Sequence, residues 1–166
     1  MVPTMRPTES RASAASIPTF HRIRRNPRRG VNPLFKLKRP CSSCPFKKGN
    51  GENFELFTGR LIEILSAPSF QCHNTIDYSE SDVEESYIVS KDCGPQQCAG
   101  LMSLLNREEI PSSIMQVGVR LRALNLEELD PDKEAYETIR EAVEAHGGDV
   151  QIVLGQLARI GLYAQS

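Results

Sequence analysis

All five cysteines of this 166-residue chain lie between positions 41 and 98, in short clusters separated by longer segments. The clusters are a C-x-x-C pair, a Cys-His dipeptide and two single cysteines, at Cys41 and Cys44, Cys72-His73, Cys93, and Cys98. Thiolate and imidazole groups are the ligands that zinc and iron–sulfur centres use in proteins. A single inorganic centre bound by several clusters would connect distant loops, so these residues constrain the fold more than any other feature.

The C-x-x-C pair is typical of a metal knuckle, because two thiolates on one tight turn can reach the same ion at tetrahedral angles. Pro40 and Pro45 flank the pair and argue against a thioredoxin-like redox motif, in which the second cysteine lies inside a helix. A closed tetrahedral site needs four ligands, and adjacent residues rarely bind the same ion. The predicted ligands are Cys41, Cys44, Cys72 and Cys98.

Three positions leave alternatives open. If residues 70–73 form a strand, Cys72 and His73 point to opposite faces, and either one could face the ion while the other packs behind it. Cys98 opens a predicted helix, where the helix dipole favours a thiolate that could be a ligand or a reactive thiol. Cys93 could replace Cys98, act as a resolving thiol, or be a small buried apolar residue.

Zinc is the predicted metal, because cysteine-rich knuckles with a nearby histidine most often bind zinc. A [4Fe-4S] cluster accepts the same thiolates, and the spacing does not exclude iron. Five cysteines in a reducing compartment favour metal ligation over disulfides. The simplest alternative is that the thiols are only core residues, since free cysteine is often buried.

The predicted fold class is α+β, a small metal-stapled domain over residues 40–166 with few short strands and about five helices. A hydrophobic content of 39% without tryptophan gives a modest core, for which a metal cross-link would matter. Apolar periodicity and turn signals predict helices at 58–66, from 98, from 112 or 113, from 130–131 to about 146, and from 149. Short strands are predicted at 70–73 and 87–89.

Charge is distributed unevenly along the chain. Residues 1–49 contain 12 Lys and Arg against one acid, whereas residues 50–166 contain 8 against 20. Residues 1–39 are rich in Ser, Pro and Arg and are predicted to be a disordered basic tail. Its arginine cluster, a candidate nucleic-acid contact because guanidinium groups neutralise phosphates, comprises Arg22, Arg24, Arg25, Arg28 and Arg29. The alternatives are an organelle transit peptide and a solvated tail without a partner.

No segment approaches the roughly 20 consecutive apolar residues that a membrane span requires, and no secretory signal is recognisable. We therefore expect a cytoplasmic protein. No phosphate-binding loop, dinucleotide fingerprint or hydrolase elbow is present, and no catalytic residues are predicted. The sequence identifies no protein partner.

Three motifs occur in a characteristic order: C-x-x-C-P-F at 41–46, F-x-C-H-x-T at 70–75 and Q-C-A-G at 97–100. In this order the chain resembles a group of small uncharacterised phage and bacterial Cys/His proteins, over residues 40–146. The resemblance implies a compact metal-binding domain and no particular activity. The basic N-terminal segment, the acidic residues 77–85 and Cys93 depart from the pattern.

These observations predict a non-enzymatic binding or regulatory module with a structural zinc ion, whose basic tail contacts nucleic acid. The alternative is an iron–sulfur or thiol redox protein, in which Cys98 or Cys93 reacts.

Overall fold

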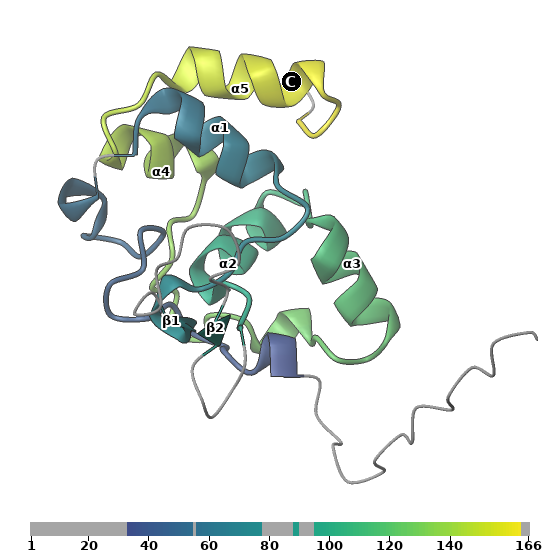
Figure 1. Ribbon diagram of the computed structural model, residues 1–166. Helices are drawn as coiled ribbons and strands as arrows, with labels where there is room; N and C mark the ends of the chain where they lie inside the picture. Colours follow the sequence, from purple (N-terminus) through teal and green to yellow (C-terminus); the bar gives the residue numbers. More distant parts are fainter. Residues whose placement is uncertain (1–32, 55, 78–87, 90–94, 164–166) are drawn as a thin grey trace, which may run out of the picture. The chain divides into compact units, whose positions relative to one another are not determined.

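The computed structural model describes residues 33–54, 56–77, 88–89 and 95–163. The chain divides into two units, residues 1–30 and 31–166, and the described residues all belong to the second. Five α-helices lie within them (Figure 1): α1 (Thr58–Ser66), α2 (Ala99–Arg107), α3 (Ser113–Arg120), α4 (Ile139–Ala145) and α5 (Val150–Arg159). Four single 3₁₀ turns are η1 (Pro33–Phe35), η2 (Gly51–Asn53), η3 (His73–Thr75) and η4 (Leu126–Glu128). None of these helices has the length and apolar character needed to cross a bilayer.

The predicted α+β class is wrong, because the described part of the chain is helical. Its strands are limited to two residues each, β1 (Ile76–Asp77) and β2 (Ile88–Val89), which pair antiparallel. The strand predicted at 70–73 is only an isolated bridge between Gln71 and Gln97, after which the backbone turns into η3. Short apolar runs do not by themselves distinguish a strand from a loop, and this explains the error.

The helix predicted at 58–66 has the bounds of α1, whereas a second predicted helix start differs from the structure. Thr58 is the first residue of α1, and its Oγ1 accepts a hydrogen bond from the Asp149 backbone N–H at 3.0 Å, which connects α1 to the start of α5. The helix predicted from 130–131 begins only at Ile139, after Thr138 caps it by accepting from the Glu141 N–H. The predicted start of α5 is correct, since Asp149 accepts from the Ile152 N–H at 3.0 Å.

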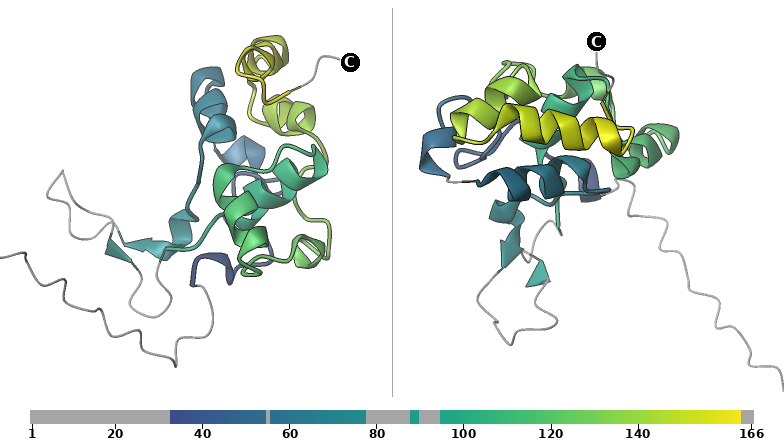
Figure 2. Two further views of the ribbon diagram at one scale, coloured as in Figure 1. Left: turned by 90° about the vertical axis from the view of Figure 1, so that its right-hand side faces the viewer. Right: turned by 90° about the horizontal axis from the view of Figure 1, so that it is seen from above.

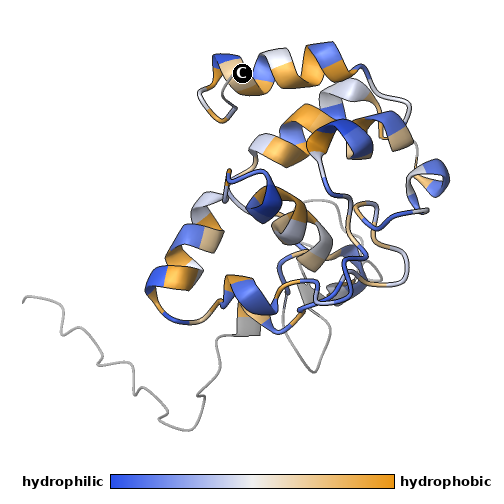
Figure 3. Ribbon diagram, turned by 180° about the vertical axis from the view of Figure 1, so that it is seen from behind, coloured by the Kyte–Doolittle hydropathy of each residue, from blue (hydrophilic) through white to orange (hydrophobic). Residues whose placement is uncertain are grey.

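Helices α1, α4 and α5 lie side by side, and the two orthogonal views agree on this arrangement (Figures 1 and 2). The colouring by hydropathy shows that each helix carries both apolar and polar residues (Figure 3). The apolar residues that these three helices bury are Leu61, Ile64, Leu65, Ile139, Ala142, Val143, Val153 and Leu157. Helix α2 is buried along most of its length, from Ala99 to Leu105. Burial of apolar surface in this core is the main driving force for the helical packing.

Residues 130–138 form a loop with a turn at 131–132 and a bridge between Ala135 and Lys47, and Asp130 binds the backbone that follows it. Asp130 has a left-handed φ of 47° and is 3% exposed. Its carboxylate accepts from the N–H groups of Glu134 and Ala135 at 2.9 and 2.8 Å and from the Arg107 guanidinium at 2.8 Å. Burial alone would raise the pKa of Asp130, but these hydrogen bonds and the Arg107 charge together hold it below its ordinary value.

We predict that Asp130→Asn lowers the free energy of unfolding by about 2–3 kcal/mol at neutral pH, because Arg107 loses its buried partner. The pKa of Asp130 is lower in the folded state, so its contribution is present above the ordinary carboxyl pKa of about 3.9 and is lost as the pH falls. Urea unfolding at several pH values should show the difference between variant and parent shrinking in acid.

The matched control is Asp132→Asn, which removes an exposed ion pair with Arg39 at 3.0 Å. Exposed pairs contribute little, so a loss below about 1 kcal/mol is expected. Equal stability of Asp130→Asn and the parent at neutral pH would contradict the role assigned to Asp130.

Candidate metal centre

Four of the five cysteines come together from three segments of the chain. Cys41 and Cys44 lie in the loop before η2, Cys72 precedes η3, and Cys98 is the N-cap of α2. The Sγ atoms of Cys41 and Cys72 are 3.7 Å apart, and those of Cys44 and Cys98 are 3.6 Å apart. The four sulfurs therefore form two close pairs, and each pair takes one sulfur from the C-x-x-C loop.

Hydrogen bonds within the loop hold the C-x-x-C turn. The Cys44 N–H donates to the Cys41 carbonyl at 3.0 Å, and the Lys47 N–H donates to the Cys44 carbonyl at 3.1 Å. The Asn50 side-chain amide donates to the carbonyls of Ser42 and Cys44 at 2.8 and 3.1 Å. The turn therefore fixes the positions of Cys41 and Cys44 without a bound ion.

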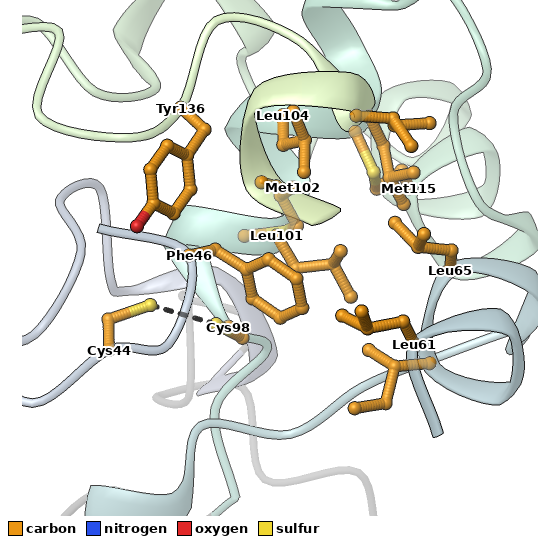
Figure 4. Packing of buried hydrophobic residues seen from close by; sticks show 14 of the residues in the cluster. Cys44, Phe46, Leu61, Leu65, Cys98, Leu101, Met102, Leu104, Met115 and Tyr136 are labelled. Carbon is orange, nitrogen blue, oxygen red and sulfur yellow. Dashed lines mark hydrogen bonds between the residues drawn. The ribbon is translucent and has the colours of Figure 1, made fainter. Parts of the chain in front are cut away.

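Two backbone hydrogen bonds hold the segments that carry Cys72 and Cys98 side by side, around the bridge between Gln71 and Gln97. The Cys72 N–H donates to the Gln96 carbonyl at 2.7 Å, and the Cys98 N–H donates to the Phe70 carbonyl at 2.9 Å. The close-up shows Cys44 and Cys98 facing each other beside the Phe46 ring, which is fully buried (Figure 4). The Cys44–Cys98 pair is therefore part of the hydrophobic core.

His73 lies close to the other sulfur pair. A ring nitrogen of His73 and the Sγ atoms of Cys41 and Cys72 all lie within 4.8 Å of one another, a group that could hold a metal ion. The expectation that Cys72 and His73 point to opposite faces is wrong, because His73 starts a 3₁₀ turn and does not continue a strand. Cysteine and histidine are therefore both available on the same side.

Hydrogen bonds orient the imidazole ring of His73. The Ser43 hydroxyl donates to Asn74 Oδ1 at 3.2 Å, and Ser43 Oγ lies 3.0 Å from His73 Nε2. A hydroxyl has one proton, so with that proton on Asn74 the His73 Nε2–H donates to Ser43. One ring nitrogen of His73 therefore bonds to Ser43, and this contact orients the ring beside Cys41 and Cys72.

Backbone N–H groups point at three of the sulfurs. Cys41 Sγ accepts from the Ser43 N–H, and Cys72 Sγ accepts from the Asn74 N–H. Cys44 Sγ accepts from the N–H groups of Phe46 and Gly100. Such donors stabilise sulfur in its thiolate form and are the usual partners of metal-bound cysteine.

Burial nevertheless opposes negative charge on the free thiols. It raises the pKa of Cys41 and raises that of Cys72 to about 12. The pKa of Cys44 is raised well above its usual range, first by the hydrogen bond with Cys98 and then by burial. A metal ion bound here would have to displace these protons, so binding must weaken as the pH falls.

Gly100 allows the close approach of α2 to the loop. A Cβ added at Gly100 would lie 2.5 Å from Cys44 Sγ and 3.3 Å from Phe46 Cβ. Only glycine leaves room for the sulfur while donating its N–H to it. The sequence identifies Gly100 only as part of the Q-C-A-G motif, and its contact with Cys44 was not predicted.

The structure groups Cys41, Cys72 and His73, and it pairs Cys44 with Cys98. Cys93 and the arginine cluster at 22–29 lie outside the described residues, so their predicted roles stay predictions. Ser43, Asn50 and Asn74 were not predicted. Ser43 and Asn74 directly neighbour Cys44 and His73 in the sequence, whereas Asn50 lies between two glycines and is marked only by that turn signal.

Comparison of the chain with protein-family models, curated proteins and solved structures finds no match. The resemblance to phage and bacterial Cys/His proteins therefore stays a prediction.

We predict that Gly100→Ala lowers the free energy of unfolding by about 1–3 kcal/mol, because the new methyl group overlaps Cys44 Sγ. Gly155→Ala in α5 is the matched control, since nothing lies within 4 Å of its added Cβ. Alanine there should be neutral or stabilise by up to about 1 kcal/mol. Thermal unfolding of both variants tests this, and equal effects would contradict the close contact at Gly100.

Proposed function

We propose that the protein is a small binding module in which a single zinc ion is held by Cys41, Cys44, Cys72 and Cys98. The ion would connect the C-x-x-C loop, the segment before η3 and the start of α2. A structural ion of this kind stabilises the folded state directly, because unfolded chains lack a preformed site. The proposal assigns no catalytic residue.

The observation that carries the proposal is the sulfur–sulfur separation. Two thiolates bound to one tetrahedral zinc at about 2.3 Å lie about 3.8 Å apart. The pairs Cys41–Cys72 and Cys44–Cys98 are at 3.7 and 3.6 Å. In a [4Fe-4S] cluster each thiolate binds a different iron, which separates the sulfurs much further. The spacing within each pair is thus that of two ligands of one ion and not of a cluster. Among the described residues, only Cys41, Cys72 and His73 have ligand atoms that all lie within 4.8 Å of one another, so binding by all four thiolates requires the Cys44–Cys98 pair to move toward this group.

A second ligand set is supported by the position of His73. In that set His73 replaces one thiolate to give a Cys₃His site, which is also common for structural zinc. Its support is the grouping of a His73 ring nitrogen with the sulfurs of Cys41 and Cys72.

We predict that the purified protein is colourless and contains a single zinc ion per chain. Cys44→Ser and Cys98→Ser should each lose the ion, since hydroxyl is a poor substitute for thiolate. Elemental analysis of parent and variants is the measurement, with His73→Gln included to decide between the two ligand sets.

Ser42→Ala is the matched control, because Ser42 lies inside the same C-x-x-C turn with an exposed side chain. It should keep the full zinc content. A brown protein containing iron, or full zinc content in both cysteine variants, would overturn the proposal.

We further propose that the basic N-terminal segment contacts nucleic acid. Its support is the charge asymmetry of the chain and the arginine cluster at 22–29. Guanidinium groups would displace counterions from phosphates whatever the base sequence. The zinc-bound unit would then serve as the folded part of a binding or regulatory protein.

Deletion of residues 1–38 should abolish binding to a fluorescent DNA duplex in an anisotropy titration. For the full chain, the logarithm of the affinity should fall steeply with the logarithm of salt concentration, as expected when several phosphates are neutralised. Equal affinity of the truncated protein, or no binding by the full chain, would remove nucleic acid as the partner.

A further inference from the structure

The C-terminal end of α3 presents two arginines that have no carboxylate partner within the described residues. Arg120 is the last residue of α3, Arg122 lies two residues further along the chain, and both are exposed. No Asp or Glu occurs in the surrounding sequence, residues 110–126. Elsewhere in the described part, ion pairs are formed by Lys38, Arg39, Lys47, Lys48, Arg60, Arg107 and Arg140. The charges of Arg120 and Arg122 therefore remain available to an anionic partner.

The backbone at this helix end is held firmly against the core. A Cβ added at the buried Gly118 would lie 2.7 Å from the Phe35 ring and 3.0 Å from Leu124 Cβ. The Gly118 carbonyl accepts from the N–H groups of Ala123 and Leu124 at 2.8 and 3.1 Å, which closes the turn after α3. Lys36, the residue after Phe35, is exposed and forms no ion pair within the described residues, so the segment packed on α3 adds a third positive charge.

Arg122 occupies a backbone position that favours glycine. Its φ is 55°, in the left-handed region, and a helix that ends in this way most often has glycine there. A side chain with a Cβ is strained in this conformation. The fold itself thus gives no reason for a long cationic side chain at position 122, and a residue held in such a conformation is a reason to look for a binding role.

The chemistry of this helix end matches a phosphate backbone. A guanidinium binds a phosphate through charge-assisted, often bidentate hydrogen bonds. Val119 and Leu121, which are 42% and 66% exposed, alternate with the two arginines and offer apolar surface to the sugars and bases of a nucleic acid. A lipid surface fits less well, because α3 has only eight residues and already buries Met115 in the core, whereas membrane-surface helices present a large apolar face.

We infer that Arg120 and Arg122 form a phosphate-binding surface on the folded unit, at which the backbone of a nucleic acid docks. The inference rests on the nucleic-acid binding proposed above, and it assigns part of that binding to residues outside the basic N-terminal segment. Each guanidinium would bind one phosphate, whatever the base sequence.

Arg122→Gly in the full chain tests the inference, with the fluorescent DNA duplex titrated at several salt concentrations. Loss of one phosphate contact should make the Kd about fivefold to tenfold weaker at about 0.1 M salt and should reduce the salt slope by about 0.9. Addition of Arg120→Gln should reduce the slope by a similar further amount. The melting temperature of Arg122→Gly should equal or exceed that of the parent, because glycine suits the left-handed φ, so the weaker binding would not come from unfolding.

Lys133→Gly is the matched control. Lys133 is also exposed, has a φ of 54° and forms no ion pair within the described residues, so the change removes the same charge and relieves the same backbone conformation. Its sequence neighbours are Asp132 and Glu134, which repel phosphate, and its Kd should stay within about twofold of the parent. Equal weakening by both glycine variants would show an effect of net charge alone and would overturn the inference.

The outcomes separate this inference from the proposed function. Duplex binding that Arg122→Gly leaves unchanged would overturn the inference alone. No binding of the duplex by the full chain would overturn both. Vesicles of phosphatidylcholine with phosphatidylserine are the second probe, and binding to these vesicles without binding to the duplex would also overturn both, in favour of an anionic lipid surface.

Discussion

The candidate centre depends on the approach, in two pairs, of four cysteine sulfurs that come from three distant segments of the chain. Pairs at 3.6 and 3.7 Å in a largely dry environment are stable only when each sulfur carries a proton or shares a cation. Backbone N–H groups already donate to three of the sulfurs and favour the thiolate form. Burial has the opposite effect, because it raises the pKa of the same three thiols. A divalent ion would resolve this conflict between hydrogen bonding and burial.

The helices position the centre through a small number of contacts. Phe46 lies beside the Cys44–Cys98 pair and fills the core, so the centre and the helical packing share one residue (Figure 4). Gly100 lets α2 approach Cys44. His146 at the end of α4 contacts the carbonyl oxygen of Pro45, the residue that follows Cys44. Loss of the centre would therefore affect α2 and α4 together, because both contact the same short loop.

Much of the centre could be predicted from the sequence, and much of its surroundings could not. The spacing of Cys41 and Cys44 indicates a knuckle, since the geometry is local to one turn. The strand predicted at 70–73 was wrong because short apolar runs do not determine backbone conformation, and the error also misplaced His73. The contacts of Gly100 and His146 join residues more than 50 positions apart, and no periodic pattern encodes such pairs.

Zinc-edge X-ray absorption of the purified full chain tests the central claim most directly, because it counts the sulfur neighbours of the ion. We expect three or four sulfur ligands at about 2.3 Å, with any remaining ligand a nitrogen from His73. An ion surrounded mainly by oxygen or nitrogen would contradict it, because the four sulfurs would then not share a common centre.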